Sequence, residues 1–323
     1  MGEAVWSHLL GFNIMNVTAL FTALPGNVAQ GIIWGIMALG VFITYRLLDF
    51  ADLSVDGSFA TGGAVTVVLM LAGYDSWVAL QIAFIAGVLA GLTTGLLHTL
   101  LGIPPILSGI LTQIALYSIN LNIMDGKANT AISVDKFDLI VSLRYIPKTI
   151  LVSIVFAVAI IALMYWYFGT EQGSAIRATG ANPAMSKAQG ININLMKVIA
   201  LGISNGVVAL SGGLLAQYQG FADINMGRGA IVIGLASLII GEVICNAFFS
   251  KRINFVLRLS FVIIGGILYY IIIGLVLWLK MPTNDLKLFT AIIVAIFLAV
   301  PYLKEQANSS FGKAKRRGGK GNA

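Results

Sequence analysis

Three consecutive stretches decide the fold of this chain: ILVSIVFAVAIIALMYWYF (150–168), GTEQGSAIRATGANPAMSKAQGININLMK (169–197) and VIALGISNGVVALSGGLLAQYQGFA (198–222). The first and the third carry no charge, and each is long enough to cross a bilayer, which takes roughly 20 apolar residues. The second is a polar island between them. Long, patterned connections tend to be functional, so we interpret the island as a docking surface on one membrane face. A solvated connecting loop is the simpler alternative.

The island contains the sequence signals of two short helices. Asn182 followed by Pro183 is typical of an N-cap and a first helical residue. The residues AMSKAQ (184–189) continue the helix for about two turns, and Gly190 supplies a stop at its C-terminal end. A preceding helix, EQGSAIRAT (171–179), is expected to end at Gly180 in the same way. Both helices are too short and too polar to cross a bilayer, so we expect them to lie along its surface.

The composition indicates a membrane protein. Hydrophobic residues make up 58% of the 323 residues and charged residues 10%, against about 25% charged residues in soluble domains. The mean hydropathy is +0.92, which leaves little mass outside the bilayer. The 36 glycines suit helices that pack closely through small residues. The single cysteine, Cys245, cannot form an internal disulfide and is expected to be buried.

The sequence also argues against several classes of function. It contains no G-x-x-x-x-G-K-[ST] motif, so any ATP hydrolysis would belong to another polypeptide. The HExxH and GxSxG motifs are missing, and His8 and His98 are the only histidines. We therefore expect a transport protein rather than an enzyme, with no catalytic residues, no cofactor and no metal site.

Apolar runs and the turn residues between them predict an all-α polytopic membrane protein with about nine transmembrane helices, eight to ten being compatible with the pattern. The expected spans are 26–45, 56–73, 77–101, 104–123, 149–168, 197–217, 229–247, 255–279 and 285–302. The chain then divides into an N-terminal extracytoplasmic or interfacial segment (1–24), a transmembrane domain (25–303) and a basic tail (304–323).

Lysine and arginine residues predict the orientation, because they concentrate in cytoplasmic loops. With a cytoplasmic C-terminus, twelve of them lie inside: Arg46, Arg177, Lys187, Lys197, Lys251, Arg252, Lys304, Lys313, Lys315, Arg316, Arg317 and Lys320. Seven lie outside: Lys127, Lys136, Arg144, Lys148, Arg228, Lys280 and Lys287, and Arg258 lies within a predicted span. This bias predicts a cytoplasmic island and tail and an outside N-terminus. We expect the tail to contact anionic lipid rather than nucleic acid.

The chain contains a short motif that occurs twice. FADLSVDG (50–57) resembles FADINMG (221–227), and each copy precedes a glycine-rich apolar span. The two copies face opposite sides of the membrane in the predicted topology, as an inverted repeat of a transporter requires. Candidates for the pathway or gate are residues of the two copies and an acidic residue in the span after the second copy: Asp52, Asp56, Gly57, Asp223, Asn225, Gly227 and Glu242.

Two separated motifs resemble the permeases of ATP-binding cassette (ABC) importers. GSAIRATGANPAMSKAQGIN (173–192) looks like the cytoplasmic coupling loop of the group that serves branched-chain amino acids and ribose-type sugars. GIIWGIMALGVFITYRLLDFADLSVDGSFATGGAV (31–65) resembles a subgroup usually paired with tryptophan/tyrosine-type substrate-binding lipoproteins. The resemblance covers most of the chain, from Gly31 to Pro301. It implies three partners: an ABC ATPase, an extracytoplasmic solute-binding lipoprotein and a second permease protomer, expected to be an identical copy.

In such permeases the coupling helix sits in a groove of the ATPase, and the resemblance places that helix at residues 184–189 here. Arg177 and Lys187 would meet acidic groups of the ATPase, with contact to lipid headgroups as the alternative. The residues that the resemblance assigns to ATPase coupling are Arg177, Thr179, Gly180, Asn182, Pro183, Ala184, Met185, Lys187, Gln189 and Gly190.

Polar groups inside the expected spans are few. Asp56 and Glu242, near a cytoplasmic end in the predicted topology, are expected to cap helix N-termini or to pair with basic residues, and a role in the pathway or gate is the alternative. Asn120 and Asn122 either line a polar entrance or bond to neighbouring helices. The outside segment 124–148 carries mixed charge, which suits docking of a solute-binding protein, and a plain solvated loop is the alternative.

These observations predict the transmembrane permease subunit of a binding-protein-dependent ABC importer in the cell membrane. A self-contained secondary transporter with inverted repeats is the alternative, and it would need an ion-coupling site at the bilayer midplane, where no persuasive carboxylate is expected. The resemblance suggests an amino acid, of aromatic type, as the solute. In this family selectivity resides largely in the binding protein.

Overall fold

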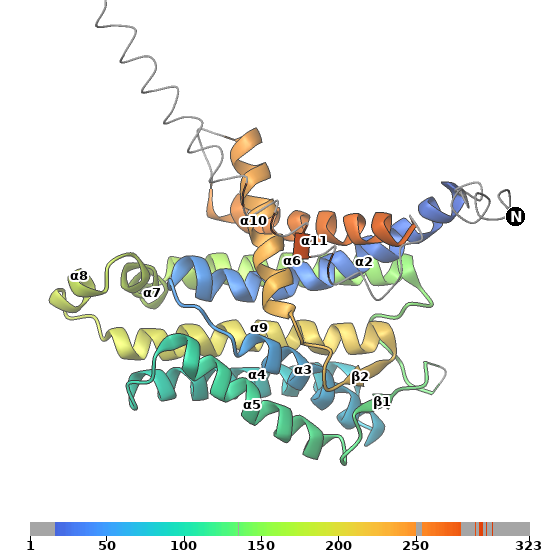
Figure 1. Ribbon diagram of the computed structural model, residues 1–323, viewed down its shortest axis with the longest axis horizontal. Coiled ribbons are helices and arrows are strands. Elements are labelled where there is room, and N and C mark those ends of the chain that lie inside the picture. The colour runs from blue at the N-terminus through green and yellow to red at the C-terminus, as the bar shows by residue number, and fades with distance from the viewer. Residues whose placement is uncertain are drawn as a thin grey trace, which may run out of the picture.

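The computed structural model is almost entirely helical over the residues that it describes, which are 17–134, 136–249, 254–278 and the single residues 288, 291, 292, 295 and 299 (Figure 1). Its long or apolar helices are α2 (Val17–Phe42), continued by the π-helix η1 (Ile43–Leu47), α3 (Val55–Leu71), α4 (Ser76–Thr99), α5 (Pro105–Ile123), α6 (Ile146–Gly169), α9 (Ile193–Gln219), α10 (Ala230–Phe248) and α11 (Phe255–Trp278). The chain is an all-α polytopic membrane protein, as predicted.

Seven of the described helices are long and apolar enough to cross a membrane, and α3 is a shorter apolar helix. Together they correspond to the first eight predicted spans. The ninth predicted span, 285–302, lies outside the described residues except for a few single positions, and the basic tail, 304–323, lies wholly outside them. A total of about nine spans therefore stays a prediction.

The first helix begins earlier than predicted. α2 starts at Val17, so residues 17–24, which were assigned to a separate N-terminal segment, are continuous with the first span. Pro25 lies inside this helix. Proline lacks one backbone donor and Gly26 follows it, so local propensity disfavours helix at this point, although α2 continues through it.

The helix α3 is too short to cross the bilayer by itself. Its 17 residues extend about 25 Å at 1.5 Å per residue, against a hydrocarbon core of about 30 Å. Residues 48–54 supply the missing length as non-helical chain between η1 and α3 (Figure 1). The predicted span 56–73 is therefore corrected to a short helix that begins inside the bundle. Non-helical backbone at this depth needs hydrogen-bond partners within the protein.

The described helices form two similar sets that run in opposite directions. In Figure 1, α2 and α4 run from right to left, whereas α9 and α11 run from left to right. The contacts between the two sets are reciprocal. The last helix of the first set, α4, packs against the first helix of the second set, α9, and α11 packs against α2 in the same way. In both sets a non-helical segment, 48–54 or 220–229, separates the first helix from the second. This is the arrangement of the inverted repeat that the two sequence copies predict.

Glycines allow the helices of the two sets to approach closely. A Cβ atom on Gly95 of α4 would lie 2.8 Å from the Cα atom of Val198 on α9. A Cβ atom on Gly31 of α2 would lie 2.6 Å from the Cα atom of Ile267 on α11. Both distances are well below the 3.5–4.0 Å or so of a favourable carbon–carbon contact. Larger residues at these positions would therefore push the backbones apart, which explains the high glycine content.

Two short strands mark one end of the bundle. β1 (Asn129–Ala131) pairs antiparallel with β2 (Phe221–Asp223). The chain after β1 then folds over the same end, where Ile140 is buried and its backbone N–H donates to Oε1 of Gln217 at 3.1 Å. This part of the segment 124–148 therefore packs on the end of the bundle.

The opposite end carries the polar island as two short helices, α7 (Glu171–Ala181) and α8 (Pro183–Ala188) (Figure 1). The island and the strands therefore lie at opposite ends of the bundle, which agrees with the grouping of loops in the predicted topology. The assignment of one end to the cytoplasm stays a prediction.

We predict that the end with α8 is cytoplasmic. In a Cys245→Ser background, a cysteine that replaces Met185, which is 59% exposed, should resist a membrane-impermeant maleimide on intact cells and react once the cells are opened. A cysteine that replaces the exposed Ser133 should react on intact cells. The wild-type chain is the control, because its buried Cys245 should not react. If only the cysteine at position 185 were labelled on intact cells, the predicted orientation would be wrong and the end with α8 would lie outside.

Candidate functional site

The polar island folds as a platform of two capped helices, and we call residues 170–192 the α7–α8 platform. Thr170 begins α7, since its Oγ1 accepts a hydrogen bond from the backbone N–H of Gly173 at 3.3 Å. Asn182 ends α7 and begins α8, since its Oδ1 accepts from the N–H of Met185 at 3.0 Å. Each cap satisfies a donor that the helix itself cannot bond. The predicted N-cap is therefore confirmed.

Most of the predicted coupling residues lie on the exposed side of the platform. Gly190, which follows α8, has a φ angle of +82°, a conformation that suits the predicted glycine stop. Neither Arg177 nor Lys187 forms an ion pair within the described part of the chain. The exposed predicted residues are Arg177, Asn182, Pro183, Ala184, Met185, Lys187, Gln189 and Gly190.

Two predicted coupling residues face the bundle instead. Thr179 is 1% exposed, and its hydroxyl donates to the carbonyl oxygen of Ala175 at 2.8 Å. Gly180 lies against the backbone carbonyl of Leu47 in η1, where a Cβ atom would not fit. The expectation that Gly180 ends the first helix is wrong, because α7 continues to Ala181. The helix ends one residue later, since the residue before a proline avoids the helical conformation.

The platform is connected to the second repeat through η1. Leu47, which contacts Gly180, follows Arg46 in this π-helix. Nε of Arg46 lies 3.0 Å from Oε1 of Glu242 on α10. Glu242 thus pairs with a basic residue, which is one of the two roles that the sequence predicted for it. The pair joins the end of α2 to α10 at the side of the bundle that carries the platform.

The two copies of the repeated motif share a local structure. Oδ1 of Asp52 accepts a hydrogen bond from the backbone N–H of Ser54 at 2.9 Å. Oδ1 of Asp223 accepts from the backbone N–H of the exposed Asn225 at 2.7 Å. Each aspartate therefore forms the same turn, to the residue two positions ahead, at the same place in the motif. The similarity of the two sequences corresponds to a similarity in structure.

The environments of the two aspartates differ. Asp52 is 2% exposed, and its Oδ2 accepts a hydrogen bond from Nδ2 of Asn205, in the middle of α9, at 2.7 Å. Asp223 is half-buried in β2 at the end of the bundle, and its Oδ2 accepts from Nδ2 of Asn129 at 3.3 Å. Asp52 therefore holds the non-helical segment 48–54 inside the bundle, whereas Asp223 stabilises the chain at the end of the bundle.

The two copies meet where the second helix of each set begins. Asp56 stands in the first turn of α3, and its carboxylate accepts hydrogen bonds from the backbone N–H groups of Gly229 and Ile231, both at 2.9 Å. Gly227 packs against the backbone carbonyl of Asp56 so closely that no Cβ atom fits. Asp56 therefore caps the N-terminus of α10, which is one of its predicted roles.

Asp56 lies within the bundle, whereas the sequence placed it near a cytoplasmic end. The next residue, Gly57, packs against α5, where its Cβ atom would lie 3.1 Å from the Cα atom of Gln113 and 2.9 Å from a methyl carbon of Leu116. Both belong to the middle of α5. The expectation failed because α3 was taken as a full-length span, and its N-terminus instead lies part-way across the bundle.

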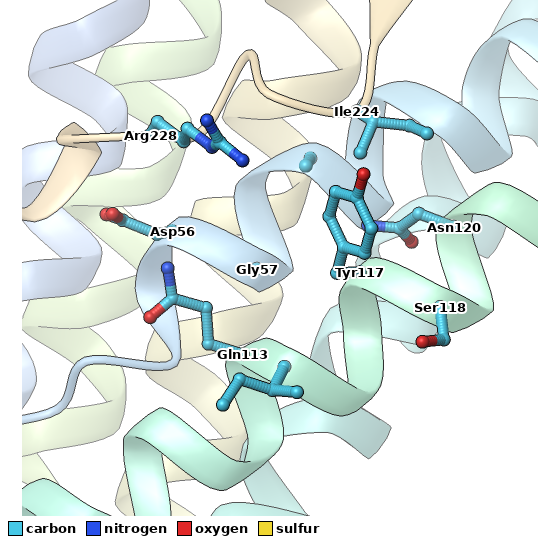
Figure 2. A pocket seen from close by; sticks show the side chains of 10 residues that line it. Asp56, Gly57, Gln113, Tyr117, Ser118, Asn120, Ile224 and Arg228 are labelled. Atoms are coloured by element: carbon cyan, nitrogen blue, oxygen red, sulfur yellow. The ribbon is translucent and has the colours of Figure 1, made fainter. Parts of the chain in front are cut away.

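A pocket of about 360 Å³ lies beside Asp56, between α3, α5 and the start of α10 (Figure 2). Arg228, which was predicted to lie in an outer loop, is exposed and lines this pocket. No local sequence signal shows that Arg228 lies beside Asp56. The lining residues are Asp56, Gly57, Ala60, Gln113, Ile114, Tyr117, Ser118, Asn120, Ile224 and Arg228.

Asn120 and Asn122 take different positions. Asn120 lines the pocket, is 1% exposed, and has no hydrogen-bond partner for Oδ1 or Nδ2 among the described residues. Asn122 is exposed, and its Nδ2 donates to the backbone carbonyl of Ser118 on its own helix at 3.0 Å. Of the two asparagines, Asn120 therefore fits the predicted polar entrance and Asn122 does not.

Comparisons with known proteins extend the resemblance seen in the sequence. A family model described as "Branched-chain amino acid transport system / permease component" matches residues 26–301. A tyrosine transport system permease protein of Clostridioides difficile (strain R20291) is 41% identical over 84% of this chain and 88% of the relative. The D-allose transport system permease protein AlsC of Escherichia coli (strain K12) is 29% identical over 78% of this chain and 73% of the relative. No solved structure gives a significant match.

We predict that Asp56→Ala lowers the stability of the protein by about 1 kcal/mol, since it removes a capping acceptor from α10. Thermal unfolding of the purified protein in nanodiscs measures this loss. Asp56→Asn, which keeps one acceptor oxygen, should retain most of the stability. Asp75→Ala is the matched control, because Asp75 precedes α4 without a side-chain capping bond. Equal melting temperatures for Asp56→Ala and Asp75→Ala would contradict the capping role.

Proposed function

Since this chain belongs to the family of permease components of branched-chain amino acid transport systems, we propose that it imports an amino acid as one of two permease protomers that a separate ABC ATPase drives. It is a transport subunit and not an enzyme. The observation that carries the proposal is the α7–α8 platform. It offers two capped helices, with Arg177 and Lys187 exposed and without ion-pair partners in the described part, at one end of a membrane-spanning bundle.

The names of the relatives support an aromatic amino acid as the solute. The relative with 41% identity is named for tyrosine transport. The relatives named for D-allose and ribose are less similar, at 29% and 26% identity. We therefore propose tyrosine, or an amino acid that resembles it, as the solute.

We propose that α8 docks on the ATPase and that its movement reaches α10 through contacts within the chain. Asn182 both ends α7 and caps α8, so the two helices move together. Gly180 seats α7 on Leu47 of η1, and the adjacent Arg46 pairs with Glu242 on α10. A rigid connection of this kind allows movement of a partner domain to alternate access to the pathway.

We propose a homodimer in which the exposed face of α5 lies toward the second protomer. This face exposes Tyr117, Ser118 and Asn122 among apolar residues. Polar side chains at membrane depth usually face protein or water rather than lipid. The pocket beside Asp56 opens on the same face, so a second copy would enclose a pathway. The binding protein would dock over residues 124–148 at the outer end, and the tail 304–323 would lie in the cytoplasm.

Secondary transport is the alternative function, and one observation favours it. Asp52 and Asp56 are carboxylates that lie within the bundle and away from its ends, whereas the sequence analysis expected no persuasive carboxylate at the bilayer midplane. Each of them, however, already accepts hydrogen bonds from the protein: Asp52 from Ser54 and Asn205, and Asp56 from two backbone N–H groups. Their structural roles therefore argue against proton or ion coupling.

Uptake into proteoliposomes distinguishes the two functions. The complete complex with its ATPase and binding protein should accumulate L-tyrosine only when ATP is supplied. The permease alone should accumulate none under an imposed proton or sodium gradient. Concentrative uptake by the permease alone would make secondary transport the correct function.

In the same assay, two changes in the platform should uncouple transport while membrane insertion stays normal. Proline cannot adopt the +82° φ angle of Gly190, so Gly190→Pro distorts the end of α8. Ala184→Asp places a negative charge on the exposed side of α8. We expect each to lower ATP-driven uptake about tenfold, as a docking penalty of about 1.4 kcal/mol would. Tyr74→Asp, at an exposed turn outside the platform, is the control. Normal uptake by both inserted variants would exclude the docking role.

A further inference from the structure

We propose that the pocket beside Asp56 binds the carboxylate of the transported amino acid, with Arg228 as the charged ligand and Asn120 as a second hydrogen-bonding group. This inference rests on the proposed function, because it assigns a recognition step to the same pathway.

Arg228 is exposed, and no acidic side chain of the described part of the chain forms an ion pair with it. The ion pair found there joins Arg46 to Glu242. Asp56 also lines the pocket, but its two oxygens accept hydrogen bonds from the start of α10, and Figure 2 shows its carboxylate pointing away from the guanidinium group. Arginine binds carboxylates through two parallel hydrogen bonds, so a solute carboxylate is a suitable partner.

Asn120 provides an independent indication of a ligand. Its amide is buried, and neither of its polar atoms has a hydrogen-bond partner among the described residues. Buried polar groups are nearly always paired, and an unpaired one is costly. A bound amino acid would remove this cost, because Nδ2 can donate to the carboxylate and Oδ1 can accept from the ammonium group.

The other lining residues suit the remainder of an amino acid. Ile114, Tyr117 and Ile224 offer apolar and aromatic surface, and Figure 2 shows the Tyr117 ring beside Asn120. The volume of about 360 Å³ falls in the usual range of small-molecule sites. The pocket therefore combines one cation, one unpaired amide and apolar surface with the polar side chains of Asp56, Gln113 and Ser118, which suits a zwitterion with an aromatic side chain.

The inner part of the pocket lies away from the lipid headgroups. Gln113, in the middle of α5, lines it together with Gly57, which packs against Gln113, whereas Asn120 lies in the last turn of α5 and Arg228 is exposed. Lipid headgroups lie at the two ends of a membrane-spanning bundle, about 15 Å from its centre. A free solute within the pathway can reach this position, whereas a headgroup would have to leave the interface.

Equilibrium binding to the permease–ATPase complex in nanodiscs, without the binding protein, tests the proposal. L-tyrosine should bind, and 3-(4-hydroxyphenyl)propionate, which lacks the amine, should compete with it. Tyramine, which lacks the carboxylate, should compete about tenfold less well or worse, because it cannot form the charge-assisted pair. Equal competition by tyramine and the propionate, or no binding of tyrosine, would overturn the proposal.

Variants identify the residues that bind. Arg228→Gln should weaken tyrosine binding about tenfold, whereas Arg228→Lys, which keeps the charge, should lose less. Asn120→Ala should weaken binding by several-fold, as expected for one hydrogen bond. Thr93→Ala, at an exposed position of α4 outside the pocket, is the control and should bind as the wild type does. Unchanged affinity in Arg228→Gln would overturn the proposal, and thermal unfolding shows that each variant is folded.

ATP-driven uptake by the wild-type complex separates this inference from the proposed function. If uptake depends on ATP but binding shows no preference for a carboxylate, the carboxylate site is wrong and the importer stands. If ATP drives no uptake, the proposed function itself is wrong.

Discussion

Non-helical backbone inside the membrane must form its hydrogen bonds within the protein. In this structure two aspartates accept such hydrogen bonds, and the rest of the fold depends on them. Asp52 binds the backbone of its own non-helical segment and the side chain of Asn205 across the bundle. Asp56 binds the first backbone N–H groups of α10. These bonds allow α3 and α10 to begin inside the bundle instead of at the membrane surface.

This arrangement creates the pocket and determines its position within the bundle. Because α3 and α10 both start at depth, the polar ends of these helices face the same region, and Arg228 lies beside Asp56. Close packing keeps the region small, since Gly227 contacts the backbone of Asp56 and Gly57 contacts α5. The inverted repeat thus brings two similar non-helical segments together and leaves a polar site between them.

The ends of the bundle carry different structures for the same chemical reason. At one end, Thr170, Asn182 and Asn192 cap successive helices, so the platform is ordered although it is polar and largely exposed. At the other end, β1 pairs with β2, which satisfies backbone groups that leave the helices. The contact from Gly180 through Leu47 and Arg46 to Glu242 then connects the platform with the helix that borders the pocket.

Features that depend on neighbouring residues could be predicted from the sequence. The lengths of the apolar runs predicted the first eight helices, the pair Asn182–Pro183 predicted the start of α8, and the glycine content predicted close packing. The similarity between FADLSVDG and FADINMG predicted an inverted repeat, and each copy contains the same aspartate turn. Local hydrogen bonds and hydrophobic periodicity determine all of these features.

The sequence by itself therefore determined the class of the protein, most of its helices and the capped platform. Only the tertiary structure decided that α3 is short, that Asp56 caps a helix far away in the sequence, that Thr179 and Gly180 face the bundle, and that Arg228 lies at a pocket. These features require contacts between segments that are distant along the chain. A single sequence does not specify such contacts, because the same residue can cap, pack or bind, and its partner decides which of these it does.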